Sequence, residues 1–222
     1  MSFKQLKQAV RASNCLLTKS YLEDLNISLE DGNGFSIIWY VNRYDKGSIE
    51  MYKLLFEYVN TKNCKNGYNQ NLLHVAIEEF NYKLFDLVLD LDDMHIDELD
   101  DCGMSALHYA VYNCSAYFVE KLIEKNACIM VADFEGYTPL HYLAMGTRSQ
   151  FGDCSKDELY HIYYMMVNKK RLTYKGSAKY SVIRLAILNN NKHFLEYCEE
   201  FYPSILEEEL NKINKLKNKK NF

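Results

Sequence analysis

Apolar residues in the middle of the chain recur with helical spacing inside short blocks that polar turns separate. One block places four apolar residues on a single helix face: Phe118, Val119, Leu122 and Ile123. The block before it does the same with Leu84, Leu87, Val88 and Leu91. Such spacing is typical of amphipathic helices that bury one side. The pattern therefore predicts a series of short helices, each packed on a neighbour.

The polar turns between these blocks repeat with a fixed period. Asp100 begins an Asp-x-x-Gly turn that is followed by Ser-x-Leu-His, and Asp133 begins the same pattern 33 residues later, with Thr in place of Ser. Weaker copies begin at Asn66 and Asp31, and a degenerate one begins at Ser181, 43 residues after Thr138. In the Asn66 copy an asparagine replaces the turn glycine, which is chemically sensible because asparagine tolerates a positive φ.

A period of 33 residues that carries this turn and Ser/Thr-x-Leu-His resembles the ankyrin repeat. The resemblance implies units of a turn and two antiparallel helices, which bury their apolar faces only against a neighbouring unit. We therefore expect a single all-α domain, an ankyrin-repeat solenoid of about five helix-turn-helix units with helical caps. The expected segments are a cap over 1–30, repeats over 31–65, 66–99, 100–132, 133–175 and 176–200, and a helix with a basic tail over 201–222.

Both ends of the chain carry apolar residues that predict capping helices, because a bare terminal repeat would expose apolar surface. The first segment predicts a short helix pair from Leu6, Ala9, Val10, Leu16, Leu17, Leu22 and Leu25. Phe201-Tyr-Pro203 predicts an interruption between two helices. The last helix then follows, with apolar positions at Ile205, Leu206, Leu210, Ile213 and Leu216. We expect Glu207, Glu208 and Glu209 on the solvated side of that helix.

Composition narrows the class of partner. The 222 residues are 48% hydrophobic with a net charge of −4, and the only basic run lies at the C-terminal end. No concentrated basic stripe is present, so nucleic acid is not an expected partner. No apolar run is long enough to span a bilayer, and residues 1–13 lack the apolar core of a leader, so no membrane is expected either. Seven scattered cysteines without a CxxC pair predict free thiols in a reducing compartment, hence the cytoplasm, while the basic tail leaves the nucleus open.

No constellation of residues predicts catalysis, a metal site, a cofactor or a small-molecule substrate. His74, His108 and His141 occupy the same place in three copies, where we expect each imidazole to bond turn backbone and tie adjacent units. Cys102 and His108 flank a turn that points them at different neighbours. The irregular stretch 146–180 holds polar candidates for a different class of function, an enzyme or an enzyme regulator: Asp153, Cys154, Asp157, Glu158, Tyr160 and His161. A long loop followed by a helix over 156–168 also explains that stretch.

The ankyrin resemblance also implies where a protein partner binds, namely beside the turns and near the ends of the first helices. The residues at those places in this chain are Phe35, Tyr44, Tyr68, Gln70, Glu78, Glu79, Asp101, Met104, Tyr112, Asn113, Phe134, Glu135 and Tyr137. Several are aromatic, and aromatic residues and Met are enriched in interface cores. The acidic residues around Asp97 and Asp101 predict faster association with a basic partner.

A narrower resemblance lies in the residue composition and the short motifs of the repeats. The tripeptides Leu107-His108-Tyr109 and Leu140-His141-Tyr142, abundant Asn and Lys, and scarce Pro and Gly look like poxvirus ankyrin proteins, including host-range and NF-kappaB-inhibiting members. This resemblance implies an intracellular viral protein that sequesters a host defence or signalling protein as an innate-immunity inhibitor. Residues 201–222 show no convincing copy of the F-box-like segment that ends longer members. A cellular or bacterial-effector ankyrin adaptor is the alternative.

Overall fold

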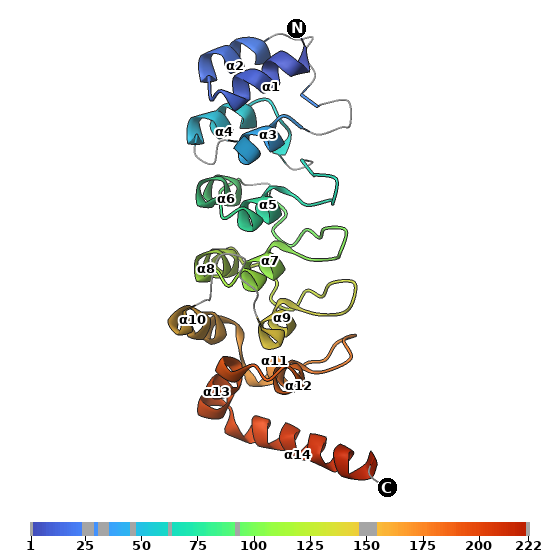
Figure 1. Cartoon of the computed structure of the whole chain (residues 1–222). Helices are drawn as coiled ribbons and strands as arrows, with labels where there is room; N and C mark the ends of the chain where they lie inside the picture. Colours follow the sequence, from blue (N-terminus) through green and yellow to red (C-terminus); the bar gives the residue numbers. More distant parts are fainter. Residues whose placement is uncertain are drawn as a thin grey trace. The chain divides into compact units, whose positions relative to one another are not determined.

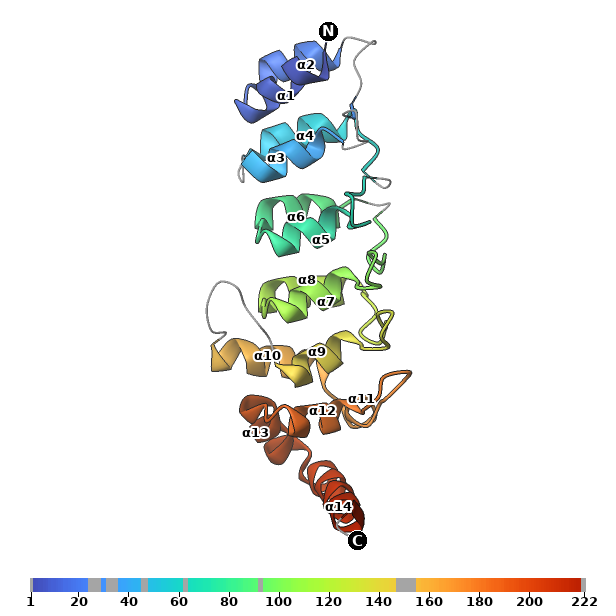
Figure 2. The ribbon, with the colours of Figure 1, turned by 45° about the vertical axis from the view of Figure 1, so that its right-hand side comes forward.

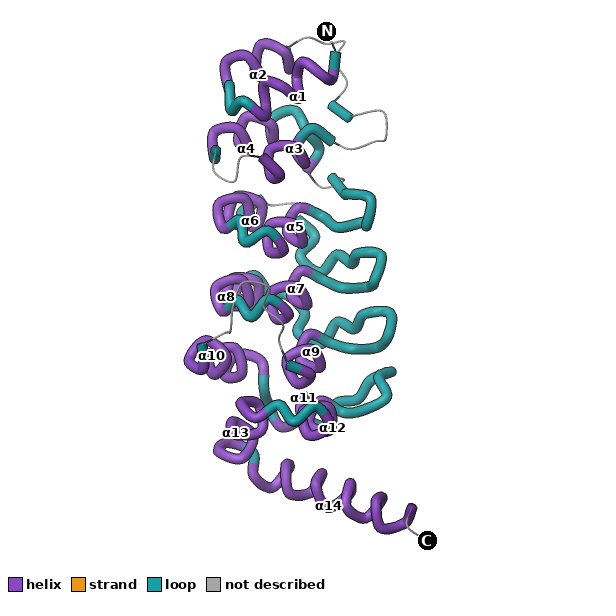
Figure 3. The backbone as a smooth tube through the Cα atoms, viewed as in Figure 1, coloured by secondary structure: helices purple, strands orange, loops and turns teal. Residues whose placement is uncertain are grey.

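The computed structural model describes residues 2–23, 29–30, 36–44, 48–61, 64–91, 94–146 and 155–220, with side chains 42–44 and 217–220 excluded. Over these residues every regular element is a helix (Figures 1 and 3), and the remaining pairing is one antiparallel bridge between Glu30 and Ser36. The predicted all-α ankyrin-repeat solenoid is confirmed. The chain divides into two compact units, Met1–Asp101 (unit 1) and Cys102–Phe222 (unit 2).

Unit 1 consists of three consecutive helix pairs. The pairs are α1 (Phe3–Arg11) with α2 (Cys15–Leu22), α3 (Ile38–Tyr44) with α4 (Ile49–Phe56), and α5 (Leu72–Glu78) with α6 (Tyr82–Leu89). Helices α2, α4 and α6 contact one another in that order, and α1 contacts α3. Each pair therefore buries its apolar side partly within the pair and partly against the next one.

Unit 2 by itself is also built from consecutive helices that pair and stack. Its helices are α7 (Ala106–Tyr112), α8 (Ala116–Glu124), α9 (Pro139–Met145), α10 (Lys156–Met166), α11 (Lys169–Leu172), α12 (Val182–Leu188), α13 (Lys192–Phe201) and α14 (Pro203–Lys220). An inner row forms from α7, α9 and α12, and an outer row forms from α8, α10 and α13 (Figure 2). The predicted break at Pro203 and the helix over 156–168 both exist, and α14 covers α12 and α13.

The turn between the two helices of a pair has the same geometry in three repeats. Phe80, Cys114 and Asn190 adopt φ values of 51, 52 and 51°, and the next residue starts the outer helix as its N-cap. Two of these caps are asparagines whose side-chain oxygen accepts a bond from the helix backbone. The cap satisfies an N–H group that the first helical turn leaves open, so these residues fix where each outer helix begins.

Burial in the outer helices differs slightly from the predicted faces. Phe118, Val119 and Leu122 of α8 are buried as expected. In α6 the buried side chains are Leu84, Phe85, Val88 and Leu89, whereas Leu87 and Leu91 are half-buried. The spacing of Leu84, Leu87, Val88 and Leu91 therefore predicted the helix correctly. The centre of the observed buried face lies one residue away from the predicted centre, because the face is wide enough to include Phe85.

The caps depart from expectation at one glutamate and at several apolar positions, since Leu17, Leu210 and Leu216 are 40%, 40% and 47% exposed. Leu16 in α2 is 86% exposed, while Leu6 and Val10 of α1 form the buried contact with the rest of unit 1. Glu209 of α14 is buried rather than solvated, because its carboxylate lies 3.7 Å from the Arg184 guanidinium and 3.5 Å from Lys212. Leu25 lies outside the described residues.

The expectation of free thiols is confirmed for five cysteines and wrong for one. Cys15, Cys64, Cys102, Cys128 and Cys198 carry thiols that form no disulfide, whereas Cys114 is disulfide-bonded. Burial raises the pKa of Cys64 to about 11 and that of Cys198 to about 12. These two thiols behave as small apolar core groups, because burial disfavours the thiolate.

Candidate partner-binding surface

In unit 2 the histidine of the inner helix α7 links that helix to the next turn, and we call each such turn a finger. The backbone N–H of Ser105 donates to His108 Nδ1 at 3.0 Å, so Nδ1 must be an acceptor and the ring proton sits on Nε2. Nε2 then donates to the carbonyl oxygen of Tyr137, 3.1 Å away in the following finger. His108 is completely buried. The ring therefore links adjacent repeats through turn backbone, as predicted.

His141 makes the first of these bonds without the second. The Thr138 backbone N–H donates to its Nδ1 at 3.1 Å, which again places the ring proton on Nε2. Nε2 is buried and makes no hydrogen bond within the described residues, although the carbonyls of Tyr180 and Tyr174 lie close enough to favour its charged form. Burial outweighs them and lowers the pKa of His141. The ring is therefore a neutral structural group rather than a poised base.

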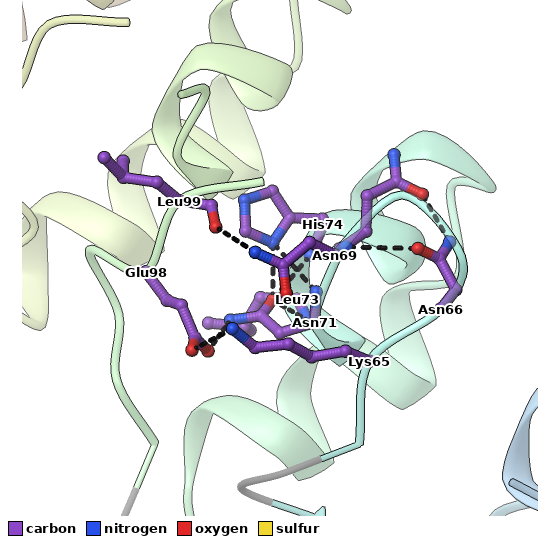
Figure 4. A network of polar contacts seen from close by, with 9 residues as sticks. Lys65, Asn66, Asn69, Asn71, Leu73, His74, Glu98 and Leu99 are labelled. Atoms are coloured by element: carbon purple, nitrogen blue, oxygen red, sulfur yellow. Dashed lines mark hydrogen bonds and ion pairs between the residues drawn. The ribbon is translucent and has the colours of Figure 1, made fainter. Parts of the chain in front are cut away.

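In unit 1 the corresponding ring is His74, whose Nδ1 accepts from the Asn71 backbone N–H at 3.2 Å, and amides and an ion pair lie beside it (Figure 4). Asn71 replaces the Ser or Thr of the other repeats, and its Nδ2 donates to Glu98 Oε2 at 3.3 Å. Lys65 Nζ lies 2.7 Å from Glu98 Oε1, and Asn69 Nδ2 donates to the Leu99 carbonyl at 3.5 Å. Glu98 and Leu99, which precede the next finger, are therefore held to the finger of the second repeat by several weak bonds.

The fingers themselves are internally bonded. The Asp133 carboxylate accepts from the backbone N–H groups of Glu135 (3.0 Å) and Tyr137 (2.8 Å), and from the Tyr142 hydroxyl at 2.6 Å. Asn66 plays the same part in unit 1, where its Oδ1 accepts from the N–H groups of Tyr68 and Gln70. A side chain at the tip of such a finger is presented by fixed backbone, which lowers the entropy lost on binding.

Neighbouring fingers also bond one another through their backbones. Phe134 N donates to the Cys102 carbonyl at 3.2 Å in unit 2, and Asp101 N donates to the Tyr68 carbonyl at 3.1 Å in unit 1. Gly103 has a φ of 79°, and a Cβ added there would lie 2.6 Å from Phe134 N and 2.7 Å from its Cδ1. Glycine is therefore required at this point for conformational and steric reasons, and the Phe134 ring lies directly over it.

The predicted contact residues divide by exposure. Tyr68 and Phe134 are each 73% exposed. Further exposed positions are Glu78, Asp101 and Glu135, and half-buried ones are Glu79, Met104, Tyr112 and Tyr137. Phe35 and the side chain of Tyr44 lie outside the described residues.

Two predicted contact residues are buried within the protein and offer little surface to a partner. Gln70 is 6% exposed because its Nε2 donates to Glu78 Oε2 at 3.2 Å and its Oε1 accepts from Asn66. Asn113 is 8% exposed because it forms the C-cap of α7, at the turn into α8. Polar residues of this kind look solvent-facing in the sequence, but local capping and side-chain bonds draw them inward.

Four aromatic rings close to the Asp133 finger form a packed group in unit 2. Tyr142 lies at the centre, with ring centroids 6.5 Å from Tyr112, 6.3 Å from Tyr137 and 5.6 Å from His108, all edge-to-face. Such pairs are favourable beyond the area they bury. Sequence reasoning omitted Tyr142 from the surface, although its place after His in the Leu-His-Tyr tripeptide was the available signal.

The polar candidates of residues 146–180 have structural neighbours where the structure describes them. No group of three or more His, Cys, Asp or Glu side chains lies close enough to hold a metal ion in the described ranges. Glu158 serves as the capping-box partner of Ser155 at the start of α10, and His161 lies 3.8 Å from Glu120. Asp153 and Cys154 lie outside the described residues. No helix in the described part of the chain is long and apolar enough to cross a bilayer.

Comparison with known proteins agrees with this architecture. A family model described as ankyrin repeats (three copies) matches residues 84–151. A putative ankyrin repeat protein of fowlpox virus is 31% identical over 147 residues, which is 66% of this chain and 34% of that protein. A palmitoyltransferase of Lachancea kluyveri is 31% identical over 139 residues, 59% of this chain and 18% of that one. This chain thus spans about a third of the first relative and less of the second.

A solved structure carries the same fold. The ankyrin repeat domain from Acinetobacter baumannii superposes with a TM-score of 0.66 at 15% identity, covering 86% of this chain and 94% of that one. At this identity the likeness concerns the fold alone.

Proposed function

We propose that this chain, which carries ankyrin repeats and so contains a protein–protein interaction module, binds a protein partner through its fingers and inner helices. The single observation that carries the proposal is Phe134, a large apolar side chain that is 73% exposed on a finger whose backbone is held by Asp133. Rigid, exposed aromatic residues are what binding hot spots are made of.

The contact surface that we propose in unit 2 consists of Phe134 at the tip and the half-buried Met104, Tyr112 and Tyr137 beside it. Glu135 supplies charge at its edge. In unit 1 the corresponding surface consists of Tyr68, Glu78, Glu79 and Asp101. Aromatic centres with acidic edges favour a partner that presents apolar side chains together with basic ones.

We further propose that the partner is a host defence or signalling protein and that this chain sequesters it in the cytoplasm without catalysis. The fowlpox relative at 31% identity and the Leu-His-Tyr tripeptides support a viral origin. An ankyrin adaptor of a cell or a bacterial effector is the second candidate, favoured by the equal identity of the palmitoyltransferase segment. Regulation of an enzyme through residues 146–180 is the third.

Affinity purification from cells, followed by mass spectrometry, tests the proposal. The wild type and a Tyr68→Ala/Phe134→Ala variant would be compared, with Leu16→Ala, which alters an exposed apolar residue of the N-terminal cap, as the matched control. We expect one or more proteins that the wild type and the control retain and the double variant loses. If the double variant retains every partner of the wild type, the finger surface is not the binding site.

A further inference from the structure

The carboxylate that closes the Phe134 finger is buried, and both of its oxygens need donors. Asp133 is 7% exposed, and its Oδ1 accepts from the backbone N–H groups of Glu135 and Tyr137 at 3.0 and 2.8 Å. Burial removes the water that would otherwise bond a carboxylate, so the second oxygen also requires a partner. The Tyr142 hydroxyl donates to Oδ2 at 2.6 Å. Tyr142 therefore completes the hydrogen bonding that the finger itself leaves open.

The Tyr142 side chain comes from a different element and is fixed there. It lies on α9, and its ring meets those of Tyr112, Tyr137 and His108 edge-to-face. Burial and the bond to Asp133 raise the pKa of Tyr142, so the hydroxyl keeps its proton and remains a donor. A ring held by three neighbours places this donor at a defined point, which orients the Asp133 carboxylate.

The finger of the second repeat meets the same requirement in another way. Asn66 stands in the place of Asp133, and its Oδ1 also accepts from two backbone N–H groups of its own finger. Its second side-chain atom is a donor rather than an acceptor, and this Nδ2 donates to Gln70 Oε1. Tyr142 follows Asp133 by nine residues, and the matching place after Asn66 holds Val75, which has no donor. In these two fingers the hydroxyl is present beside the carboxylate and absent beside the amide.

The loop that Asp133 closes carries Phe134, whose side chain is 73% exposed. The bonds from the Glu135 and Tyr137 amides to Oδ1 fix the backbone immediately after Phe134. Without a donor at Oδ2 the carboxylate is free to rotate, which loosens those two bonds. A loop that is already ordered loses less conformational entropy when it binds.

We infer that Tyr142 is a positioning residue of the finger surface, because its hydroxyl holds the Asp133 carboxylate in the orientation that presents Phe134 to a partner. The hydroxyl acts on the partner only through Asp133. The consequence for binding rests on the proposed function, whereas the effect on the finger does not.

Amide hydrogen exchange, followed by NMR on the full chain, tests the effect on the finger without a partner. Tyr142→Phe keeps the ring and removes the hydroxyl. We expect the Glu135 and Tyr137 amides to exchange about five- to tenfold faster in this variant, the range of one lost hydrogen bond. Tyr112→Phe is the matched control for exchange, because its ring packs on Tyr142 but its hydroxyl forms no hydrogen bond among the described residues. Equal exchange in Tyr142→Phe and the wild type would overturn the inference.

A rescue separates positioning of the finger from a general loss of stability. Asp133→Asn combined with Tyr137→Gln copies the amide pair of the second-repeat finger into this one. In that background Tyr142→Phe should no longer change the exchange of the Glu135 amide. A change as large as the one without the two substitutions would mean that the hydroxyl acts on the fold rather than on Asp133, and would also overturn the inference.

Retention of proteins from cell lysate by the immobilised chain tests the consequence for binding. Proteins that Phe134→Ala loses should also be retained less by Tyr142→Phe, about three- to tenfold, the range for ordering one loop side chain. Tyr164→Phe, at an exposed position on α10, is the control and should retain them fully. If the wild type retains no protein that Phe134→Ala loses, the proposed function is wrong, and the exchange result still decides the effect on the finger. Full retention by Tyr142→Phe, despite faster exchange, would rule out a role in binding.

Discussion

His108 and Tyr137 belong to successive repeats of unit 2, and the Nε2–H of the one donates to the backbone carbonyl of the other across 3.1 Å. The opposite ring nitrogen accepts from the Ser105 backbone at 3.0 Å. One buried ring therefore satisfies two backbone groups of successive repeats.

Removal of this ring should destabilise the fold. We expect His108→Ala to lower the free energy of unfolding by about 1–3 kcal/mol, because it leaves the buried Ser105 N–H and the part-buried Tyr137 carbonyl unpaired. Urea denaturation followed by circular dichroism gives the value. His161→Ala, at an exposed position on α10, is the control and should shift the midpoint little. An unchanged midpoint in His108→Ala would mean that the ring is not a structural link.

Stability should fall in mild acid through His141. Its folded pKa lies below the unfolded value of 6.5, so the unfolded chain binds the proton more readily. The contribution of this ring is complete above that pH and decreases as the pH drops through it toward the lower, folded pKa. Unfolding free energies at several pH values should show a smaller acid loss in His141→Gln than in the wild type. Parallel pH curves for the two proteins would contradict this assignment.

Gly103 should tolerate no side chain. We expect Gly103→Ala to cost about 1–3 kcal/mol, because its φ of 79° is strained for alanine and the new Cβ would meet Phe134. Gly146 provides a matched control, since its φ of 103° is also positive but an added Cβ meets nothing within 4 Å. Thermal unfolding of both variants separates the two contributions, and equal losses would rule out a steric part.

Finger aromatics should matter for binding more than for folding. Once a partner is identified, Phe134→Ala and Tyr68→Ala should each weaken binding by about 1–3 kcal/mol, the range of aromatic anchors. Their melting temperatures should change little because both side chains are largely exposed. Isothermal calorimetry measures the loss. Unaltered affinity in both variants would remove the fingers from the interface.

The repeat period and turn chemistry were sufficient to predict the helices, because His, Gly and the N-cap residues of each unit are local requirements. Exposure was harder to predict. Gln70 and Asn113 look polar and free in the sequence, yet capping and side-chain bonds bury them. Glu209 is buried because Arg184, distant in the sequence, lies opposite it.

The exposure of Tyr164 and Phe201 could not have been predicted from periodicity. Tyr164 and Phe201 occur among many aromatic residues, and only the packing of α10 against α13 shows which rings cover the core and which remain outside.

The bonds from the Ser105 and Thr138 amides to imidazole nitrogens have a spectroscopic consequence. These two protons are held by rings rather than by carbonyls. Their exchange with deuterium therefore requires the imidazole to swing out of its buried position, so each amide reports the opening of its own repeat. Because His108 is tied to the next finger and His141 is not, the Ser105 amide should exchange more slowly than that of Thr138, giving a residue-level measure of how firmly consecutive repeats hold one another.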